Sequence, residues 1–277
     1  MMEDMTGVDA KTIPLDDKGS MSIFTSSKIL GYENDKILGP TGAVGVPEFN
    51  TRFTRGVLLD TMPTKFDFLV RICGYTHGTD VWLGNAQDLI KEGICDISKV
   101  IGCRDGIMLD LIRYGLENAL AFKIMESVRK GKGLTPEWEA EMRAHNVPDW
   151  YIGSCKKIKY MFPKAHAAAY TIASLRLAWF KVYQPVAYYA AYFTIKRDFF
   201  DGELVMKGRA KIEERLKTLR EMPNPTAKDE GNMIILRIVL EMLARGFSFL
   251  PVEIGKSEAT YFIPEDGKIR LPLCSLN

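Results

Sequence analysis

Basic and aromatic side chains are interleaved along one stretch of this sequence, a combination that suits a ligand carrying both phosphates and bases. The stretch from Trp150 to Arg197 contains no Asp or Glu. Its eight cations are Lys156, Lys157, Lys159, Lys164, Arg176, Lys181, Lys196 and Arg197. Cations that face phosphates release counterions, and aromatic rings offer stacking faces to bases. The stretch therefore predicts binding to a polyanion, although most of its aromatic residues lie at helical spacing, which is more typical of a core.

Lys164 and His166 follow Pro163 at the start of a predicted helix. A helix N-terminus presents unpaired N–H groups and the positive end of the macrodipole, so the two side chains and the helix end together can hold a phosphate. A lone histidine is more often structural. Arg176 lies about 15 Å further along the same helix, so it would contact a different phosphate or serve in packing.

The turn from Tyr75 to Asp80 is a second candidate. Thr76, His77 and Thr79 supply hydrogen-bonding groups, and Trp82 and Asn85 follow directly. On residue types alone, a well-capped helix without a binding role is the favoured interpretation.

Several classes of chemistry have no matching motif. The sequence contains no P-loop, no G-x-G-x-x-G and no G-x-S-x-G. Its five cysteines lack C-x-x-C spacing and its three histidines form no ligand cluster, so we expect neither disulfides nor a protein-bound metal. The pair Asp16-Asp17 lies in an irregular region and is interpreted as surface or as a helix cap. We therefore assign no catalytic residue.

The elements that must position these residues are predicted to be mainly α-helical. Residues 1–50 look irregular, with one short helix at Ser22–Leu30, and a turn is expected at Gly74–Gly78. Helices are expected at Thr51–Thr61, Lys65–Ile72, from Thr79 or Asp80 to Glu92, at Asp105–Tyr114, Glu117–Lys130, from Pro136, and at Asp149–Lys159, Lys164–Gln184, Val186–Ile195, Glu203–Glu221 and Asp229–Arg245. Ile97–Ile101 is a short segment. Alternation in Phe247–Glu253, Thr260–Pro264 and Lys268–Leu273 predicts a small β unit that closes the chain.

The whole-chain composition is that of a globular protein. The chain has 277 residues with 47% hydrophobic and 26% charged residues, and its net charge is only +2. Any signal for nucleic acid is therefore local. The chain has no apolar run of about 18 residues and no signal peptide, so we expect no membrane partner and a cytoplasmic location.

Several runs of sequence resemble the PolC-type DNA polymerase III alpha subunit of low-GC Gram-positive bacteria. The most distinctive run extends from Tyr160 to Tyr170, Tyr-Met-Phe-Pro-Lys-Ala-His-Ala-Ala-Ala-Tyr. The others are Thr12–Asp17, Gly45–Phe49, His77–Gln87 and Phe122–Leu134, and the similarity covers about residues 5–273. Thr76 stands where that family is expected to have serine, and Arg113-Tyr114 is in transposed order.

The resemblance implies that this chain is the fingers of a replicative polymerase, which close over the incoming nucleotide and the template base. It implies three segments: residues 1–50 adjoining the palm, a helical core at 51–200, and 201–277 leading to a duplex-binding domain. The palm carboxylates that bind Mg²⁺ would precede Met1, so the chain alone would be inactive. The expected partners are primer-template DNA, a deoxynucleoside triphosphate (dNTP), the rest of the polymerase and other replisome proteins, in association with the nucleoid.

The contacts expected on this basis fall into two sets. The nucleotide-binding set is Lys164, His166, Arg129, Lys123, Arg104, Thr76, His77 and Thr79. The DNA-binding set is Lys156, Lys157, Lys159, Arg176, Trp82 and Asn85. Two alternatives stay open, a free-standing helical nucleic-acid-binding module and a protein-interaction scaffold.

Overall fold

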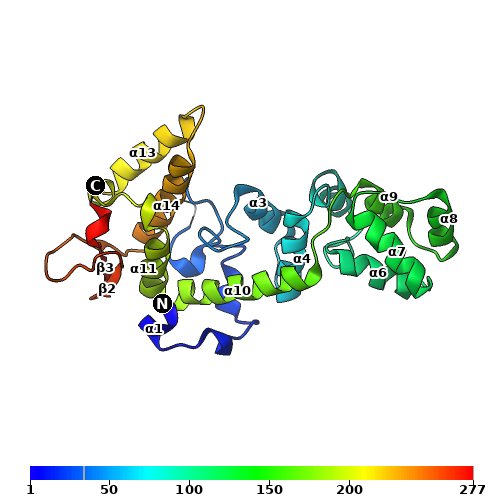
Figure 1. Ribbon diagram of the computed structural model, residues 1–277, viewed down its shortest axis with the longest axis horizontal. Helices are drawn as coiled ribbons and strands as arrows, with labels where there is room; N and C mark the ends of the chain where they lie inside the picture. The colour runs from blue at the N-terminus through cyan, green and yellow to red at the C-terminus, as the bar shows by residue number, and fades with distance from the viewer. Residues whose placement is uncertain (34, 277) are drawn as a thin grey trace. The chain divides into compact units, whose positions relative to one another are not determined.

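The computed structural model describes residues 1–33 and 35–276, so the final residue of the predicted segment 201–277 lies outside it. The described residues are mainly α-helical and include one small sheet near the C-terminus, which confirms the predicted fold class (Figure 1). They pack as two compact units: residues 51–173 form one, and residues 1–50 and 174–277 form the other. The division of the sequence into segments 1–50, 51–200 and 201–277 rests on composition and on the family resemblance. It is a different division from these two packing units and stays a prediction.

The 51–173 unit consists of helices joined by short loops. Its elements are α3 (Arg52–Thr61), α4 (Phe66–His77), the π-helical turn η3 (Trp82–Ala86), α5 (Gln87–Lys91), α6 (Arg104–Arg113), α7 (Asn118–Arg129), α8 (Pro136–Ala144), α9 (Asp149–Lys157) and the first ten residues of α10 (Lys164–Tyr183). Helix α6 packs against α7, and α8 packs against α9. Their buried faces carry apolar residues at helical spacing, as Ile107 and Leu111 show on α6. Thr135 accepts the N–H of Trp138 and caps α8, which begins at Pro136 as the sequence predicts.

Two predictions between residues 74 and 92 are wrong. The chain does not turn at Gly74, because α4 continues to His77. A Cβ at Gly74 would lie 2.4 Å from the backbone oxygen of Gly102, so the glycine serves close packing and does not end the helix. The helix predicted up to Glu92 is also interrupted, since Leu83 has ψ 133° and Gly84 has φ 67°.

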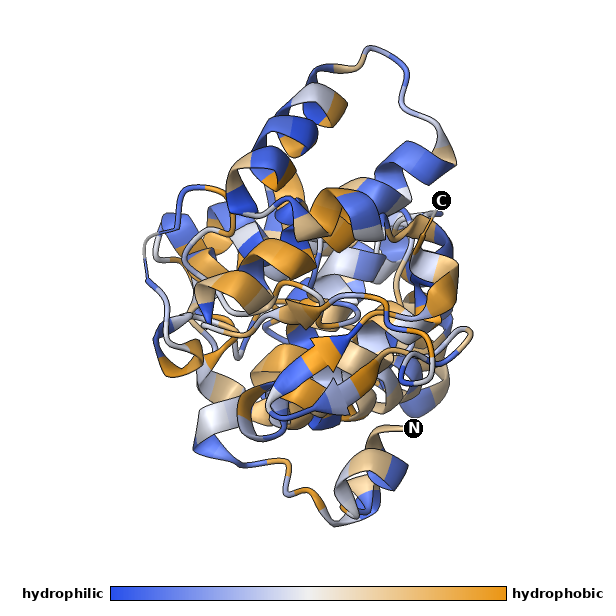
Figure 2. Cartoon of the chain, turned by 90° about the vertical axis from the view of Figure 1, so that its left-hand side faces the viewer, coloured by the Kyte–Doolittle hydropathy of each residue, from blue (hydrophilic) through white to orange (hydrophobic). Residues whose placement is uncertain are grey.

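The unit formed by residues 1–50 and 174–277 combines an irregular N-terminal segment with long helices. Its elements are α1 (Met2–Thr6), η1 (Ala10–Thr12), α2 (Lys18–Ser22), η2 (Lys28–Leu30), the rest of α10, α11 (Pro185–Ile195), η4 (Arg197–Phe199), α12 (Gly202–Met206), α13 (Arg209–Glu221), α14 (Ala227–Ala244), β1 (Phe249–Leu250), β2 (Ile263–Glu265), β3 (Lys268–Arg270) and η5 (Leu273–Ser275). Hydrophilic and hydrophobic residues alternate along the helices (Figure 2). On α13, Ile212, Leu216 and Leu219 are buried, which is the spacing of an amphipathic helix packed on one side.

Two predicted helices of this unit are wrong in extent. Ser22–Leu30 is not one helix, because α2 ends at Ser22 and only a 3₁₀ turn forms at Lys28–Leu30. Glu203–Glu221 divides into α12 and α13 at Gly208, whose φ of 87° is left-handed and cannot continue a helix.

The sheet has the order β1–β3–β2. Strand β1 pairs parallel with β3, and β2 pairs antiparallel with β3. The turn between β2 and β3 has positive φ at both Asp266 (50°) and Gly267 (75°), the combination of a type I′ hairpin. The strands are only two or three residues long, much shorter than the alternating segments predicted from the sequence.

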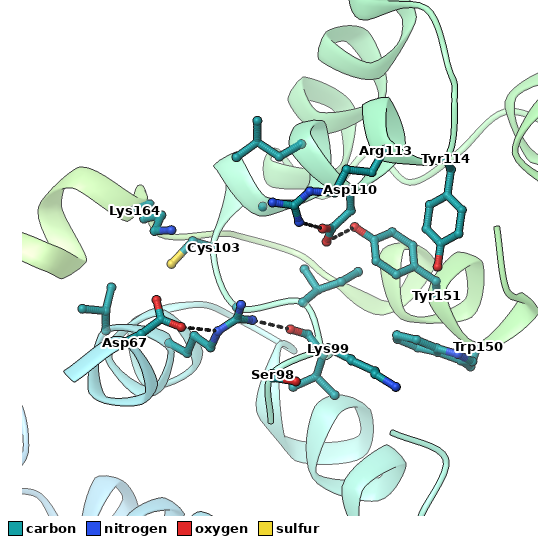
Figure 3. A pocket seen from close by; sticks show the side chains of 17 residues that line it. Asp67, Ser98, Lys99, Cys103, Asp110, Arg113, Tyr114, Trp150, Tyr151 and Lys164 are labelled. Carbon is teal, nitrogen blue, oxygen red and sulfur yellow. Dashed lines mark hydrogen bonds and ion pairs between the residues drawn. The ribbon is translucent and has the colours of Figure 1, made fainter. Parts of the chain in front are cut away.

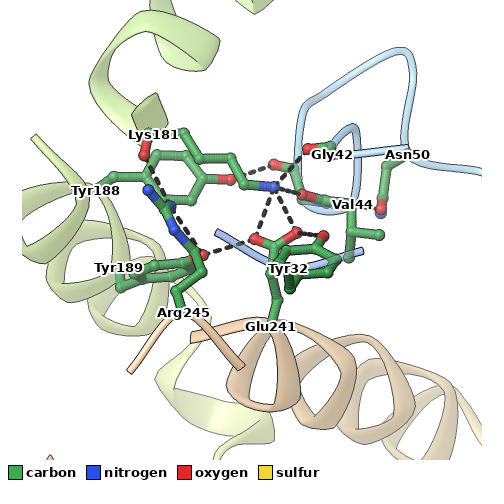
Figure 4. Close-up of polar contacts among 10 residues, drawn as sticks. Tyr32, Gly42, Val44, Asn50, Lys181, Tyr188, Tyr189, Glu241 and Arg245 are labelled. Carbon is green, nitrogen blue, oxygen red and sulfur yellow. Dashed lines mark hydrogen bonds and ion pairs between the residues drawn. The ribbon is translucent and has the colours of Figure 1, made fainter. Parts of the chain in front are cut away.

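A buried ion pair lies inside this unit and corrects one sequence interpretation (Figure 4). Lys181 on α10 and Glu241 on α14 are both fully buried, with Nζ 2.7 Å from a Glu241 carboxylate oxygen. Tyr32 and Tyr189 donate to the same carboxylate at 2.8 and 2.6 Å, and burial next to Glu241 raises the pKa of both phenols. Lys181 also donates to the Gly42 carbonyl at 2.7 Å. Lys181 therefore contributes no charge to a polyanion-binding surface.

None of the helices within residues 1–33 and 35–276 has the length and apolarity needed to cross a membrane.

Candidate nucleotide and nucleic-acid site

An extended segment, residues 158–163, brings together four predicted contact regions of the 51–173 unit. Its main chain pairs with Thr79: the Thr79 N–H donates to the Tyr160 carbonyl at 2.9 Å, and the Lys159 N–H donates to the Thr79 carbonyl at 3.1 Å. The Met161 N–H donates to the Arg129 carbonyl, and the Phe162 carbonyl accepts from the Arg104 N–H, both at 3.3 Å. Lys164 follows directly. Main-chain bonds thus hold residues distant in sequence along one short segment.

Lys164 and Arg104 lie on either side of one carboxylate. Asp105 accepts the Lys164 backbone N–H at 2.8 Å, and Arg104 Nε is 3.7 Å from the same oxygen. Asp105 therefore occupies the end of α10 where the sequence predicts a phosphate, and the Lys164 side chain remains exposed beside it. Burial, with Asp105 nearby, raises the pKa of the Cys103 thiol to about 11.

A row of rings runs from α4 onto α10. Phe162 lies 5.0 Å from His77 and 6.1 Å from His166, measured between ring centroids. His166 and Tyr170 are nearly parallel, at 24° and 6.4 Å. Both are exposed. Because Phe162, His166 and Tyr170 are spaced by four residues, they share one side of the chain as it enters α10.

Hydrogen bonds within α4 occupy the polar groups of the predicted turn. The Thr76 hydroxyl donates to the Ile72 carbonyl at 2.9 Å, and His77 Nδ1 lies 2.7 Å from the Cys73 carbonyl. Thr79 is exposed. The structure thus places the His77 ring in the aromatic row and gives the Thr76 hydroxyl a bond within the helix.

The C-terminal end of α7 carries Arg129, with Lys123 exposed on the preceding turns. Glu126 forms ion pairs with Arg129 and with Lys130, the latter at 3.0 Å. These two cations hold the pKa of Glu126 at about 2. Half of the positive charge at this helix end is therefore compensated locally.

The basic residues around the end of α9 differ in whether their side chains have bonding partners. Lys156 pairs with Glu139 at 2.7 Å, and Lys157 donates to the Gly84 carbonyl at 2.7 Å. Lys159 is exposed. Its backbone carbonyl lies 2.5 Å from the place where a Cβ of Gly131 would be, so the glycine lets the loop after α7 approach the extended segment.

Three predicted DNA contacts are placed differently. Trp82 is 2% exposed and packs 5.3 Å from Tyr75, and Asn85 is 1% exposed and bonded to Ser154 at 2.6 Å. Both therefore have packing roles. Arg176 belongs to the other compact unit, where it donates to the Lys11 carbonyl at 3.4 Å.

The structure also forms a pocket of about 430 Å³ that the sequence interpretation did not foresee (Figure 3). Only Lys164 belongs to both the predicted site and this pocket; Arg71, Lys99, Arg113 and Trp150 are added by the fold. These four residues are visible in the sequence, but they come from four separate segments, namely α4, the loop before α6, α6 and α9. No spacing rule connects them.

Comparisons with known proteins identify the family of the chain. The family model described as "Bacterial DNA polymerase III alpha subunit finger domain" matches residues 1–146, more than half of the chain. The chain belongs to this finger-domain family. The finger-domain chain is also 53% identical over its whole length to "DNA polymerase III PolC-type" of Bacillus subtilis, of which it covers 19%.

Two further proteins of that description show the same relation. The identity is 51% for Thermotoga maritima and 51% for Staphylococcus epidermidis, each over the whole of this chain and about a fifth of the relative. These comparisons confirm the resemblance to the PolC-type polymerase. The chain corresponds to a finger-domain region that spans about a fifth of the length of these relatives.

Proposed function

We propose that this finger domain binds the incoming dNTP and primer-template DNA within a bacterial replicative DNA polymerase. The observation that carries the proposal is the extended segment 158–163, which assembles Arg104, Arg129, Thr79 and Lys164 within one unit. Cations from three helices that converge on one segment suit a polyphosphate, since separate charges can pair with separate phosphates.

Different side chains of this site would bind the triphosphate, a base and the DNA backbone. Lys164 is an exposed point charge at the start of α10, and Arg104 presents a guanidinium beside it, so both suit the triphosphate. The exposed rings of His166 and Tyr170 offer stacking faces to a base. Lys159 and Lys123 are exposed and suit the DNA backbone.

The carboxylates near this site do not fit the role of Mg²⁺ ligands. Asp105 accepts the Lys164 amide, and Glu126 is paired with Arg129 and Lys130. We therefore propose that the Mg²⁺ ions of the polymerase bind to carboxylates in another part of the longer polypeptide. Consistently, primer extension by the 277-residue chain alone with Mg²⁺ should be undetectable, and extension that survives repurification would contradict this assignment.

The nucleotide role is tested by Lys164→Ala in the full-length polymerase. Loss of a charged contact costs about 1.5–3 kcal/mol, so kcat/KM for dNTP should fall about 10- to 150-fold. Lys217→Ala, on the exposed side of α13, is the matched control. Normal kinetics for Lys164→Ala would remove this residue from the site.

The DNA role is tested by titrating labelled primer-template into the chain at several salt concentrations. Binding through phosphates must weaken steeply as salt rises. An absent or salt-independent response would contradict DNA binding and favour a protein-interaction scaffold.

A further inference from the structure

The pocket of the 51–173 unit lies between α4, α6, the start of α9 and the start of α10 (Figure 3). Its floor is the loop 98–103 that precedes α6. Every lining residue lies within the same compact unit, so the pocket is formed by this unit alone.

The charged groups in the pocket leave an excess of two cations. Arg71 pairs with Asp67 at 3.2 Å, and Arg113 pairs with Asp110 at 3.1 Å. Lys99 and Lys164 are exposed, and neither ammonium has an ion-pair or hydrogen-bond partner among the residues that the structure describes. Lys99 and Lys164 are therefore the two cations of the lining that are not paired with a lining carboxylate.

Aromatic rings form one wall of the pocket. The Tyr151 ring is buried and lies 5.5 Å from Trp150 and 6.4 Å from Tyr114. Tyr151 donates to Asp110 at 3.1 Å, which fixes its ring. Trp150 and Tyr114 remain partly exposed, so their outer faces are accessible to a planar ligand.

We propose that this pocket holds one nucleotide of an unpaired DNA strand, with the base against Trp150 or Tyr114 and a flanking phosphate on Lys99. The inference rests on the proposed DNA-binding function and specifies where the unpaired strand lies. Stacking against aromatic rings does not depend on the sequence of the strand, as replication requires.

The charge balance favours a strand over a free triphosphate. A phosphodiester carries one negative charge, which the Lys99 ammonium matches while Lys164 stays available to the triphosphate. A triphosphate carries about four negative charges at neutral pH, and it would also face the carboxylates of Asp67 and Asp110. The pocket offers too little positive charge for it.

The test measures fluorescence anisotropy of a labelled 12-nucleotide oligothymidylate and of a 12-base-pair duplex with the 277-residue chain. Trp150→Ala should weaken single-strand binding at least about fivefold and leave duplex binding within twofold, and Trp150→Phe should retain most of the affinity. Lys99→Ala should reduce the salt dependence by about 0.7 in the log–log slope. Lys99 is exposed, so this variant is informative even if Trp150→Ala unfolds.

The controls are Trp138→Ala on α8 and Lys91→Ala on α5, which lie in the same unit but outside the pocket. Equal effects of pocket and control variants, unchanged binding by the pocket variants, or an equal loss of duplex binding would each overturn the proposal. If the unmodified chain binds neither oligonucleotide, the proposed function fails as well. If Trp150→Ala weakens binding of thymidine triphosphate instead, the occupant is a free nucleotide and the strand proposal is overturned.

Discussion

At the scale of residues, the carboxylate of Glu241 is fully buried and bonded to three side chains. It receives bonds from Lys181, Tyr32 and Tyr189, and Lys181 is bonded in turn to carbonyl oxygens of the loop 42–44. Such a pair is costly to bury, and breaking it is costlier still, because the remaining charge is left without a partner.

Lys181→Met should therefore lower the free energy of unfolding by about 3–5 kcal/mol, measured by urea denaturation. The double variant Lys181→Met/Glu241→Gln removes both charges and should recover part of that loss. Lys217→Met, which removes one member of the exposed pair Lys217–Glu221, should change stability by less than about 1 kcal/mol. Equal losses in the buried and exposed pairs would contradict the role assigned to burial.

Glu126 predicts a specific dependence of stability on pH. Its pKa falls from an ordinary 4.5 to about 2 because Arg129 and Lys130 bind the carboxylate. A depressed folded-state pKa contributes stability that is complete above 4.5 and is lost as the pH falls from 4.5 through about 2.

The thermal midpoint of Glu126→Gln should therefore lie below that of the unmodified chain above pH 4.5, and the two should converge towards pH 2. Circular dichroism melts at several pH values measure the difference. A difference that does not vary with pH would show that Arg129 is not paired with Glu126 in solution.

The sequence identified the types of residue in the site better than their environments. Lys164, His166 and Lys159 are exposed as a binding role requires, whereas Trp82, Asn85 and Lys181 are buried. Composition cannot distinguish exposed from buried residues of the same type. A buried lysine can be recognised only through its ion-pair partner, and the partner of Lys181, Glu241, lies 60 residues away in the sequence. The pocket was not predicted because its lining residues also lie far apart in the sequence.

At the scale of elements, the long alanine-rich helix was predicted well, and the roles of glycines were not. For the alanine-rich α10, the predicted range Lys164–Gln184 starts at the observed first residue and ends one residue after the observed last residue, Tyr183. Gly74 was interpreted as a turn but lies inside α4, and Gly208 was placed inside a helix but divides two. A glycine marks either a turn or a close approach, and only the neighbouring backbone decides which.

Gly131 tests how the extended segment is held. Gly131 and Gly133 have nearly equal φ, 70° and 72°, but only at Gly131 would a Cβ meet another segment, at 2.5 Å from the Lys159 oxygen. Gly133→Ala should cost about 1 kcal/mol from backbone strain. Gly131→Ala should cost more, about 2–4 kcal/mol, and should also weaken DNA binding because Lys159 is displaced.

Urea denaturation and the anisotropy titration measure the two effects. If Gly131→Ala and Gly133→Ala behave alike, the close approach of the two backbones contributes nothing.

At the scale of the whole molecule, the division into two compact units predicts partial independence. The unit 51–173 is continuous in sequence and has its own buried residues, such as Leu69, Leu111 and Ile124. We expect residues 51–173 alone to be helical by circular dichroism and to melt cooperatively.

Leu111→Ala in that shortened chain should lower its stability by about 2–5 kcal/mol, because Leu111 is fully buried. A non-cooperative melt, or a melt insensitive to Leu111→Ala, would show that the unit needs the rest of the chain.

The other unit is discontinuous, and this affects how the protein emerges from the ribosome. The loop around Gly42 to Pro47 obtains its bonds from Ser174, Lys181 and Tyr188. During synthesis, residues 51–173 must first be translated, which takes about 6–25 s at the usual rates of elongation. Phe24 and Phe49 are buried in the folded chain. During synthesis their side chains therefore stay exposed to solvent while the intervening unit is already able to fold. A nascent-chain chaperone would find its binding site within residues 1–50, which are translated before residues 51–173 but complete their packing only after them.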